Sequence, residues 1–117
     1  MKINKNNAGI EAEKIAATFL VNQGLILIVE NYHCRFGEID LIMQEAKTLV
    51  FLEVRLRTNN RFGGPADSIT KQKQQKLIAT AQHFLQNQPS CACRFDAILM
   101  DTLNPNHIQW LRNAFDA

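Results

Sequence analysis

Two short runs of alternating apolar and charged residues constrain this chain more than any other feature. Residues 37–42 read Gly-Glu-Ile-Asp-Leu-Ile, and residues 49–55 read Leu-Val-Phe-Leu-Glu-Val-Arg. Alternation with a period of two is typical of a strand with one buried face. With residues 44–48 as the connection, the two runs predict an antiparallel hairpin.

The register of this hairpin decides which charges meet. The pairing we predict places Asp40 opposite Glu53 and Glu38 opposite Arg55, with all four side chains on one side of the sheet. Two facing carboxylates destabilise a sheet unless a positive charge lies between them, and a divalent cation often fills that role. The hairpin therefore predicts half of a metal site. A shift of one residue would place Asp40 and Glu53 on opposite faces.

The remaining elements follow from periodicity and helix-ending residues. A first helix is predicted to about Gln23 and a second to about Asn87, with further strands at residues 25–29, 94–100 and 107–111. The first of these strands is almost entirely apolar, which is typical of a strand covered on both faces. The order α, β, β, β, α, β, β predicts a three-layer α/β/α sandwich around a small mixed sheet. The residues predicted to cap or end the helices are Asn6 or Asn7, Gly24, and Asp67 or Ser68.

The hairpin motif also resembles a known group of proteins. An Asp at one strand end followed by Glu-x-Lys on the next strand is the pattern of the nuclease superfamily with a restriction-endonuclease-like core. The chain is more closely similar to the small, uncharacterised bacterial YraN family, and this resemblance extends over most of its length. The matching pieces are Gly9, Glu13, Ala16, Gly24, Asn31, the hairpin, Arg57, Phe62-Gly63, Lys73, Arg94-Phe95-Asp96 and Asn113-Ala114-Phe115.

One residue departs from the superfamily pattern, because Arg55 stands where the pattern has lysine. A lysine ammonium is compact and can shift its pKa, whereas guanidinium stays protonated and spreads its charge over a planar fork. Arg55 is therefore suited to holding a phosphate and poorly suited to moving a proton. Lys73 lies on the apolar line near the start of the second helix. It either covers the core with its methylenes or supplies the missing ammonium.

Glu13 lies at the edge of the apolar stripe of the first predicted helix. A carboxylate there either extends to solvent or is needed inside. Nucleases of this core that are related to Holliday-junction resolvases place an acidic residue of the first helix in the metal site. The resemblance therefore implies Glu13, Asp40 and Glu53 as ligands of Mg²⁺ or Mn²⁺. Together with Arg55 and Lys73, which would clamp the phosphate, they form the predicted catalytic set.

The charge of the chain is unevenly distributed. The net charge is +2, but residues 55–76 carry +5 and the rest of the chain −3. A basic segment that begins at the predicted metal site suits an anionic polymer, and the alternative is a solvated helix start. We expect nucleic acid as the partner, with DNA favoured over RNA. The residues predicted to contact it are Arg57, Arg61, Lys71, Lys73 and Lys76.

Length and composition limit the remaining choices. The 117 residues suffice for one nuclease-like domain over residues 1–117. No apolar run is long enough to span a bilayer, and the start lacks the apolar stretch of a signal peptide, so we expect a cytoplasmic protein without membrane contact. The three cysteines fit a reducing compartment, and their spacing matches no standard zinc pattern. The exposed edges of a small sheet are compatible with a homodimer.

Three functions are compatible with these residues. The first, which we favour, is a Mg²⁺-dependent endonuclease or phosphodiesterase, for example one that resembles Holliday-junction resolvases. The second is a non-catalytic nucleic-acid-binding module that keeps the fold and the basic segment but lost the chemistry together with the lysine. The third is a structural domain in which Glu38 and Arg55 form an ordinary cross-strand ion pair.

Overall fold

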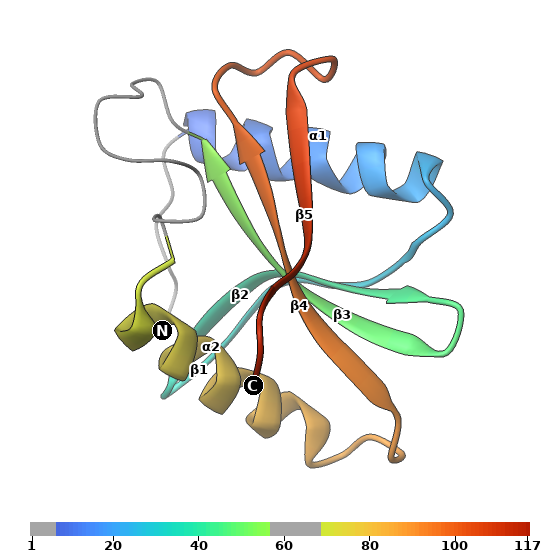
Figure 1. Ribbon diagram of the computed structural model, residues 1–117, viewed down its shortest axis with the longest axis vertical. Coiled ribbons are helices and arrows are strands. Elements are labelled where there is room, and N and C mark those ends of the chain that lie inside the picture. Colours follow the sequence, from blue (N-terminus) through green and yellow to red (C-terminus); the bar gives the residue numbers. More distant parts are fainter. Residues whose placement is uncertain (1–6, 57–68) are drawn as a thin grey trace.

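A computed structural model describes residues 7–56 and 69–117 of the chain. The elements follow the predicted order, and α1 and α2 cover opposite faces of a five-stranded mixed sheet, so the three-layer α/β/α architecture is confirmed (Figure 1). Within the described ranges, no helix is long and apolar enough to cross a bilayer. The elements are α1 (Asn7–Asn22), β1 (Ile26–Cys34), β2 (Gly37–Glu45), β3 (Thr48–Leu56), α2 (Lys71–Leu85), β4 (Ala92–Met100) and β5 (Ile108–Phe115).

The strands lie in the sheet in the order of the sequence, from β1 at one edge to β5 at the other. All neighbours are antiparallel except β3 and β4, which are parallel. Parallel neighbours need a crossover, and α2 lies in the connection between β3 and β4. The start of α2 therefore belongs to the same connection as the end of β3, where the predicted site lies.

The hairpin of β2 and β3 has the predicted register. Its ladder runs from Glu45 opposite Thr48 to Leu41 opposite Leu52. Only residues 46–47 remain as the turn, so the connection is shorter than the predicted five residues. Because the turn has only two residues, β2 continues to Glu45 and β3 already begins at Thr48.

Helix α1 ends at Asn22, and Gly24 follows as the predicted stop. The φ of Gly24 is +101°, a left-handed conformation that glycine adopts without a side-chain penalty. Its backbone N–H donates to the carbonyl of Val21 over 3.0 Å. The buried positions of α1 include Ala12, Ala16 and Leu20, which follow the predicted apolar stripe.

Helix α2 begins later than predicted. Thr70 caps it, because the Thr70 hydroxyl accepts a 3.1 Å hydrogen bond from the backbone N–H of Lys73. The predicted caps, Asp67 and Ser68, lie outside the described residues, and their assignment as the cap is wrong because the helix starts at Lys71. Threonine satisfies the free N–H groups of a first turn in the same way as Asp or Ser.

The prediction that residues 25–29 form a strand covered on both faces is wrong. Strand β1 is an edge strand, and Ile26 and Ile28 are 59% and 42% exposed. The two core clusters take most of their buried sheet residues from the inner strands β2, β3 and β4. An apolar run alone does not distinguish a central strand from an edge strand that the helices leave partly uncovered.

Candidate metal and phosphate site

Asp40 and Glu53 lie together where the β2–β3 ladder ends. The last pair of the ladder is Leu41 with Leu52, so the next pair in the same register is Asp40 with Glu53. Beyond that point the backbone N–H of Val54 donates to Asp40 Oδ2 over 2.8 Å. Asp40 and Glu53 are only 5% and 6% exposed. The hairpin thus brings two carboxylates together beneath the surface.

The alternation of β2 is interrupted at Asp40. Ile39 and Ile42, which are three positions apart, both pack in the core cluster on the α2 side of the sheet. On the neighbouring strand Asn31 lies opposite Asp40 and has a φ of +52°. A residue in this conformation interrupts the regular pleat. The prediction that residues 37–42 alternate regularly between the two faces is therefore wrong, although the register is correct.

The Glu53 carboxyl has a strongly perturbed pKa. The pKa rises from an ordinary value of 4.5 to about 7. Burial is the largest cause, and the hydrogen bond and the charge of Asp40 add to it, whereas Lys73 and Arg55 act in the opposite direction. Because the two carboxylates are close, the pair holds a proton near neutral pH. Shifts of this kind are concentrated at functional sites.

Two cations lie between this pair and the solvent. Lys73 Nζ is 3.3 Å from Glu53 Oε2, and Arg55 Nη2 is 3.7 Å from the same oxygen. Their side chains are 35% and 36% exposed, so each contacts both the buried carboxylate and the outside. Of the two alternatives for Lys73, the structure has its ammonium beside Glu53. Both cations are placed where a phosphate could bind.

The carboxylate pair fits a small divalent cation. Glu53 Oε2 is buried and makes no hydrogen bond within the described structure. Mg²⁺ is commonly bound by one or two carboxylates, with water and substrate phosphate as the other ligands. Among residues 7–56 and 69–117, no group of three or more His, Cys, Asp or Glu side chains is arranged to hold a metal. Within these ranges, Asp40 and Glu53 form a buried pair of carboxylates that could contribute two ligands.

Glu13 is buried as well, but it lies on α1 and not on the hairpin. It is 8% exposed, so its carboxylate does not extend to solvent. Helix α1 packs on the face of the sheet opposite α2, whereas Lys73 reaches Glu53 from α2. The described structure does not bring Glu13 into one three-carboxylate group with Asp40 and Glu53, and its role as a metal ligand stays a prediction.

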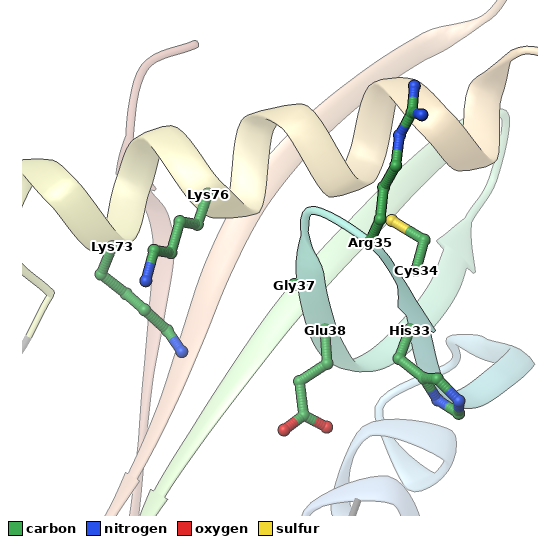
Figure 2. Close-up of a pocket in the computed structure, with 7 residues that line it drawn as sticks. All are labelled: His33, Cys34, Arg35, Gly37, Glu38, Lys73 and Lys76. Carbon is green, nitrogen blue, oxygen red and sulfur yellow. The ribbon is translucent and has the colours of Figure 1, made fainter. Parts of the chain in front are cut away.

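The predicted nucleic-acid contacts are only partly described. Arg57 and Arg61 lie outside the described residues, and Lys71 and Lys76 are exposed on the first two turns of α2. Lys73 and Lys76 line one side of a cleft of about 800 Å³, and residues 33–35, 37 and 38 line the other (Figure 2). The residues of this second wall carry no recognisable motif, so the sequence alone does not predict it.

A second buried aspartate has a different environment. Asp96 is 1% exposed and accepts hydrogen bonds from Arg94 Nε at 3.0 Å and from Trp110 Nε1 at 3.0 Å. A further bond, also of 3.0 Å, comes from the backbone N–H of Asn113. The contact with Arg94 is also an ion pair. Its carboxylate is saturated with donors, which indicates a structural role.

Glu45 extends this donor-rich group. Its carboxylate accepts two hydrogen bonds from Arg112, at 2.8 and 3.0 Å, and lies 2.8 Å from Arg94 Nη1. These contacts, those from Arg112 most of all, lower the pKa of Glu45 to about 2. Glu45 and Glu53 therefore deviate from the ordinary glutamate value in opposite directions.

Fold and site together define an α/β/α sandwich protein with an acidic pair on its central hairpin. Residues 12–100 match the uncharacterised protein family UPF0102, and the chain belongs to this family, which is the YraN family of the sequence resemblance. A UPF0102 protein of Nitrosomonas europaea is 55% identical over 111 residues, which cover 94% of each chain. One from Methylobacillus flagellatus is 52% identical, over 93% of this chain and 96% of its own. One from Psychromonas ingrahamii is 53% identical, over 94% and 90%.

Proposed function

We propose that this protein is a metal-dependent phosphodiesterase that acts on nucleic acid. The observation that supports this most strongly is the buried pair of Asp40 and Glu53 with the Lys73 ammonium 3.3 Å from Glu53. Burying two carboxylates against each other opposes folding unless a cation compensates them. The resemblance to restriction-endonuclease-like nucleases supports the same combination of an acidic pair and a lysine.

Asp40 and Glu53 are the proposed ligands of Mg²⁺ or Mn²⁺, with Glu13 as a further candidate. When bound, the ion would act as a Lewis acid beside the scissile phosphate. The pair itself must release the proton that it holds near neutral pH before both carboxylates bind a metal. The Val54 N–H fixes the Asp40 carboxylate, so its orientation does not depend on the ion.

Lys73 and Arg55 are proposed to hold the phosphate. Lys73 would take the place of the lysine that the superfamily has two residues after the glutamate, since its ammonium reaches Glu53 from α2. Arg55 is suited to two parallel hydrogen bonds with phosphate oxygens. The remaining basic residues would neutralise neighbouring phosphates of a DNA or RNA strand. These are Arg57, Arg61, Lys71 and Lys76.

A cleavage assay with Mg²⁺ or Mn²⁺ tests this proposal on single-stranded, duplex and branched DNA and RNA. We expect the wild type to cut at least one of these, Asp40→Asn and Lys73→Ala to abolish cutting, and Arg55→Lys to change it little. Lys47→Ala is the matched control, because Lys47 is an exposed lysine in the turn at the other end of β3. Loss of cutting in the control together with Lys73→Ala would contradict the role of Lys73.

The second candidate is a non-catalytic nucleic-acid-binding module, and the presence of Arg55 in place of lysine favours it. In that case wild type and Arg55→Lys bind nucleic acid but cut none of the substrates. Tight binding of nucleic acid without cleavage, with either metal ion, would support the non-catalytic binding module over the nuclease. A cytoplasmic location and a homodimer stay predictions under both candidates.

A further inference from the structure

The turn between β1 and β2 presents an aromatic side chain at the surface. Phe36 is 40% exposed. The Arg35 guanidinium carbon lies 4.8 Å from the centre of its ring, and the His83 ring of α2 lies 6.2 Å away at 64°. Phe36 is thus supported from two sides while part of its surface stays open. We call Arg35 and Phe36 the turn platform.

The turn platform has a fixed position against α2. Gly37 follows it with a φ of +149°, and a Cβ there would lie 3.2 Å from Thr80 Oγ1 and 3.8 Å from Lys76 Cβ. Glycine suits this position, because a side chain would be strained by the backbone angle and would press against Thr80. Tyr32, just before the turn, hydrogen-bonds to His83 Nδ1. The platform and α2 therefore form one surface.

One face of α2 connects the turn platform with the acidic pair. Lys73, Lys76, Thr80 and His83 follow one another at spacings of three or four residues, which places them on the same side of the helix. At 1.5 Å per residue this line is about 15 Å long. Lys73 contacts Glu53, and Lys73 and Lys76 line the cleft (Figure 2). Thr80 is buried beneath the turn, and the His83 ring lies against Phe36.

We propose that Lys73, Lys76 and the turn platform bind an unpaired segment of the nucleic acid next to the scissile phosphate, an inference that rests on the proposed function. The backbone would follow Lys73 and Lys76, and a base would stack on the turn platform. Stacking on an aromatic or guanidinium plane requires an exposed base face, which unpaired nucleotides offer and a continuous duplex does not. Glu38 on the opposite wall of the cleft disfavours phosphates there. The substrate class is therefore nucleic acid with a single-stranded part.

Binding in chelator tests this without any cleavage. Fluorescence anisotropy with a labelled oligodeoxythymidine and with a blunt-ended duplex would compare Phe36→Ala and Phe36→Tyr with wild type. Loss of the ring should weaken single-strand binding by about tenfold or more and change duplex binding little, whereas tyrosine should restore it. Leu103→Ala is the matched control, because Leu103 is 39% exposed on the β4–β5 connection. Photo-crosslinking of wild type with an iodouridine-containing strand should label Phe36.

The outcomes separate this inference from the proposed function. Selective loss of single-strand binding in Phe36→Ala, in a protein that never cuts, would uphold the inference and refute the nuclease. Cutting that depends on Asp40, with equal single-strand binding by wild type and Phe36→Ala and no crosslink at Phe36, would overturn the inference and leave the nuclease intact. Absence of all nucleic-acid binding would refute both and leave Phe36 as a contact for a different kind of partner.

Discussion

The sheet buries two aspartates, Asp40 and Asp96. Their backbone surroundings are similar, but their charged neighbours differ. An asparagine with a left-handed backbone lies on the edge strand beside each of them. Asn31, with a φ of +52°, falls between the pairs Glu30–Leu41 and Tyr32–Ile39, and Asn113, with a φ of +51°, lies at the register shift beside Asp96. Each also accepts a backbone N–H, from Val54 over 2.8 Å and from Asn113 over 3.0 Å. An interrupted strand is thus used twice to hold a buried carboxylate.

The two sites differ in the side chains that contact the aspartate. Asp96 meets the guanidinium of Arg94 and the indole N–H of Trp110, so its charge is compensated by donors. Asp40 meets a second carboxylate, and the pKa of Glu53 rises to about 7. Burial of an acid is therefore not itself a sign of function, because Asp96 is the more deeply buried of the two. A buried acid indicates a functional site when its neighbours disfavour its negative charge, as the second carboxylate does here.

The largest effect that this comparison predicts concerns Asp96. Asp96→Ala should lower the free energy of unfolding by about 3–5 kcal/mol, because it leaves the N–H donors of Trp110 and Asn113 without their acceptor and removes one of the two carboxylates that compensate Arg94. Asp40→Asn keeps an oxygen for the Val54 N–H and removes one of two like charges. Without metal it should cost nothing or stabilise the protein. Urea unfolding in chelator measures both, and equal losses would break the comparison.

The next effect concerns pH. The folded protein binds the Glu53 proton more tightly than the unfolded chain, since the folded pKa of about 7 exceeds 4.5. The free energy of unfolding should therefore fall as the pH rises from 4.5 through 7, by about 3 kcal/mol for this group without metal. Glu53→Gln should remove that fall. Glu45→Gln is the control, and it should leave the fall in place because the pKa of Glu45 is about 2.

The smallest effect concerns charge on the surface. Lys76 lines the cleft near the acidic pair, whereas Arg112, half-exposed, belongs to the Glu45 group. Lys76→Ala should reduce the magnitude of the log–log salt slope of DNA binding by about 0.9, the value expected for one phosphate contact. Arg112→Ala should leave the slope unchanged. A smaller slope for Arg112→Ala, with no change for Lys76→Ala, would indicate that DNA binds at the Glu45 group and not at the cleft.

The sequence was sufficient to predict the element order, the three layers and the hairpin register, because each rests on local periodicity and a tight turn. It was also sufficient to pair Asp40 with Glu53, since a strand register follows from its turn. It failed for β1, because exposure of an edge strand depends on where the helices cross the sheet. The Thr70 cap was missed because Asp67 and Ser68 are equally good caps.

The two acidic groups show the same limit at the level of side chains. The donors of Asp96 come from residues 94, 110 and 113, and only Arg94 is near enough in sequence to be paired by inspection. The distance between Lys73 and Glu53 depends on the crossover between β3 and α2, which no pattern in the sequence determines. Arg35 and Phe36 carry no motif. Their place beside α2 becomes evident only from the structure, in which Gly37 packs against Thr80.

Calorimetric titration with Mn²⁺ near pH 7 shows whether Asp40 and Glu53 form a metal site. Run in two buffers with different ionisation enthalpies, it reports both binding and the release of protons. We predict that wild type binds Mn²⁺ and releases protons, that Glu53→Gln loses the binding, and that Glu45→Gln keeps it. Equal binding by wild type and Glu53→Gln, or no binding by a folded wild-type protein, would contradict the assignment of Asp40 and Glu53 as a metal site.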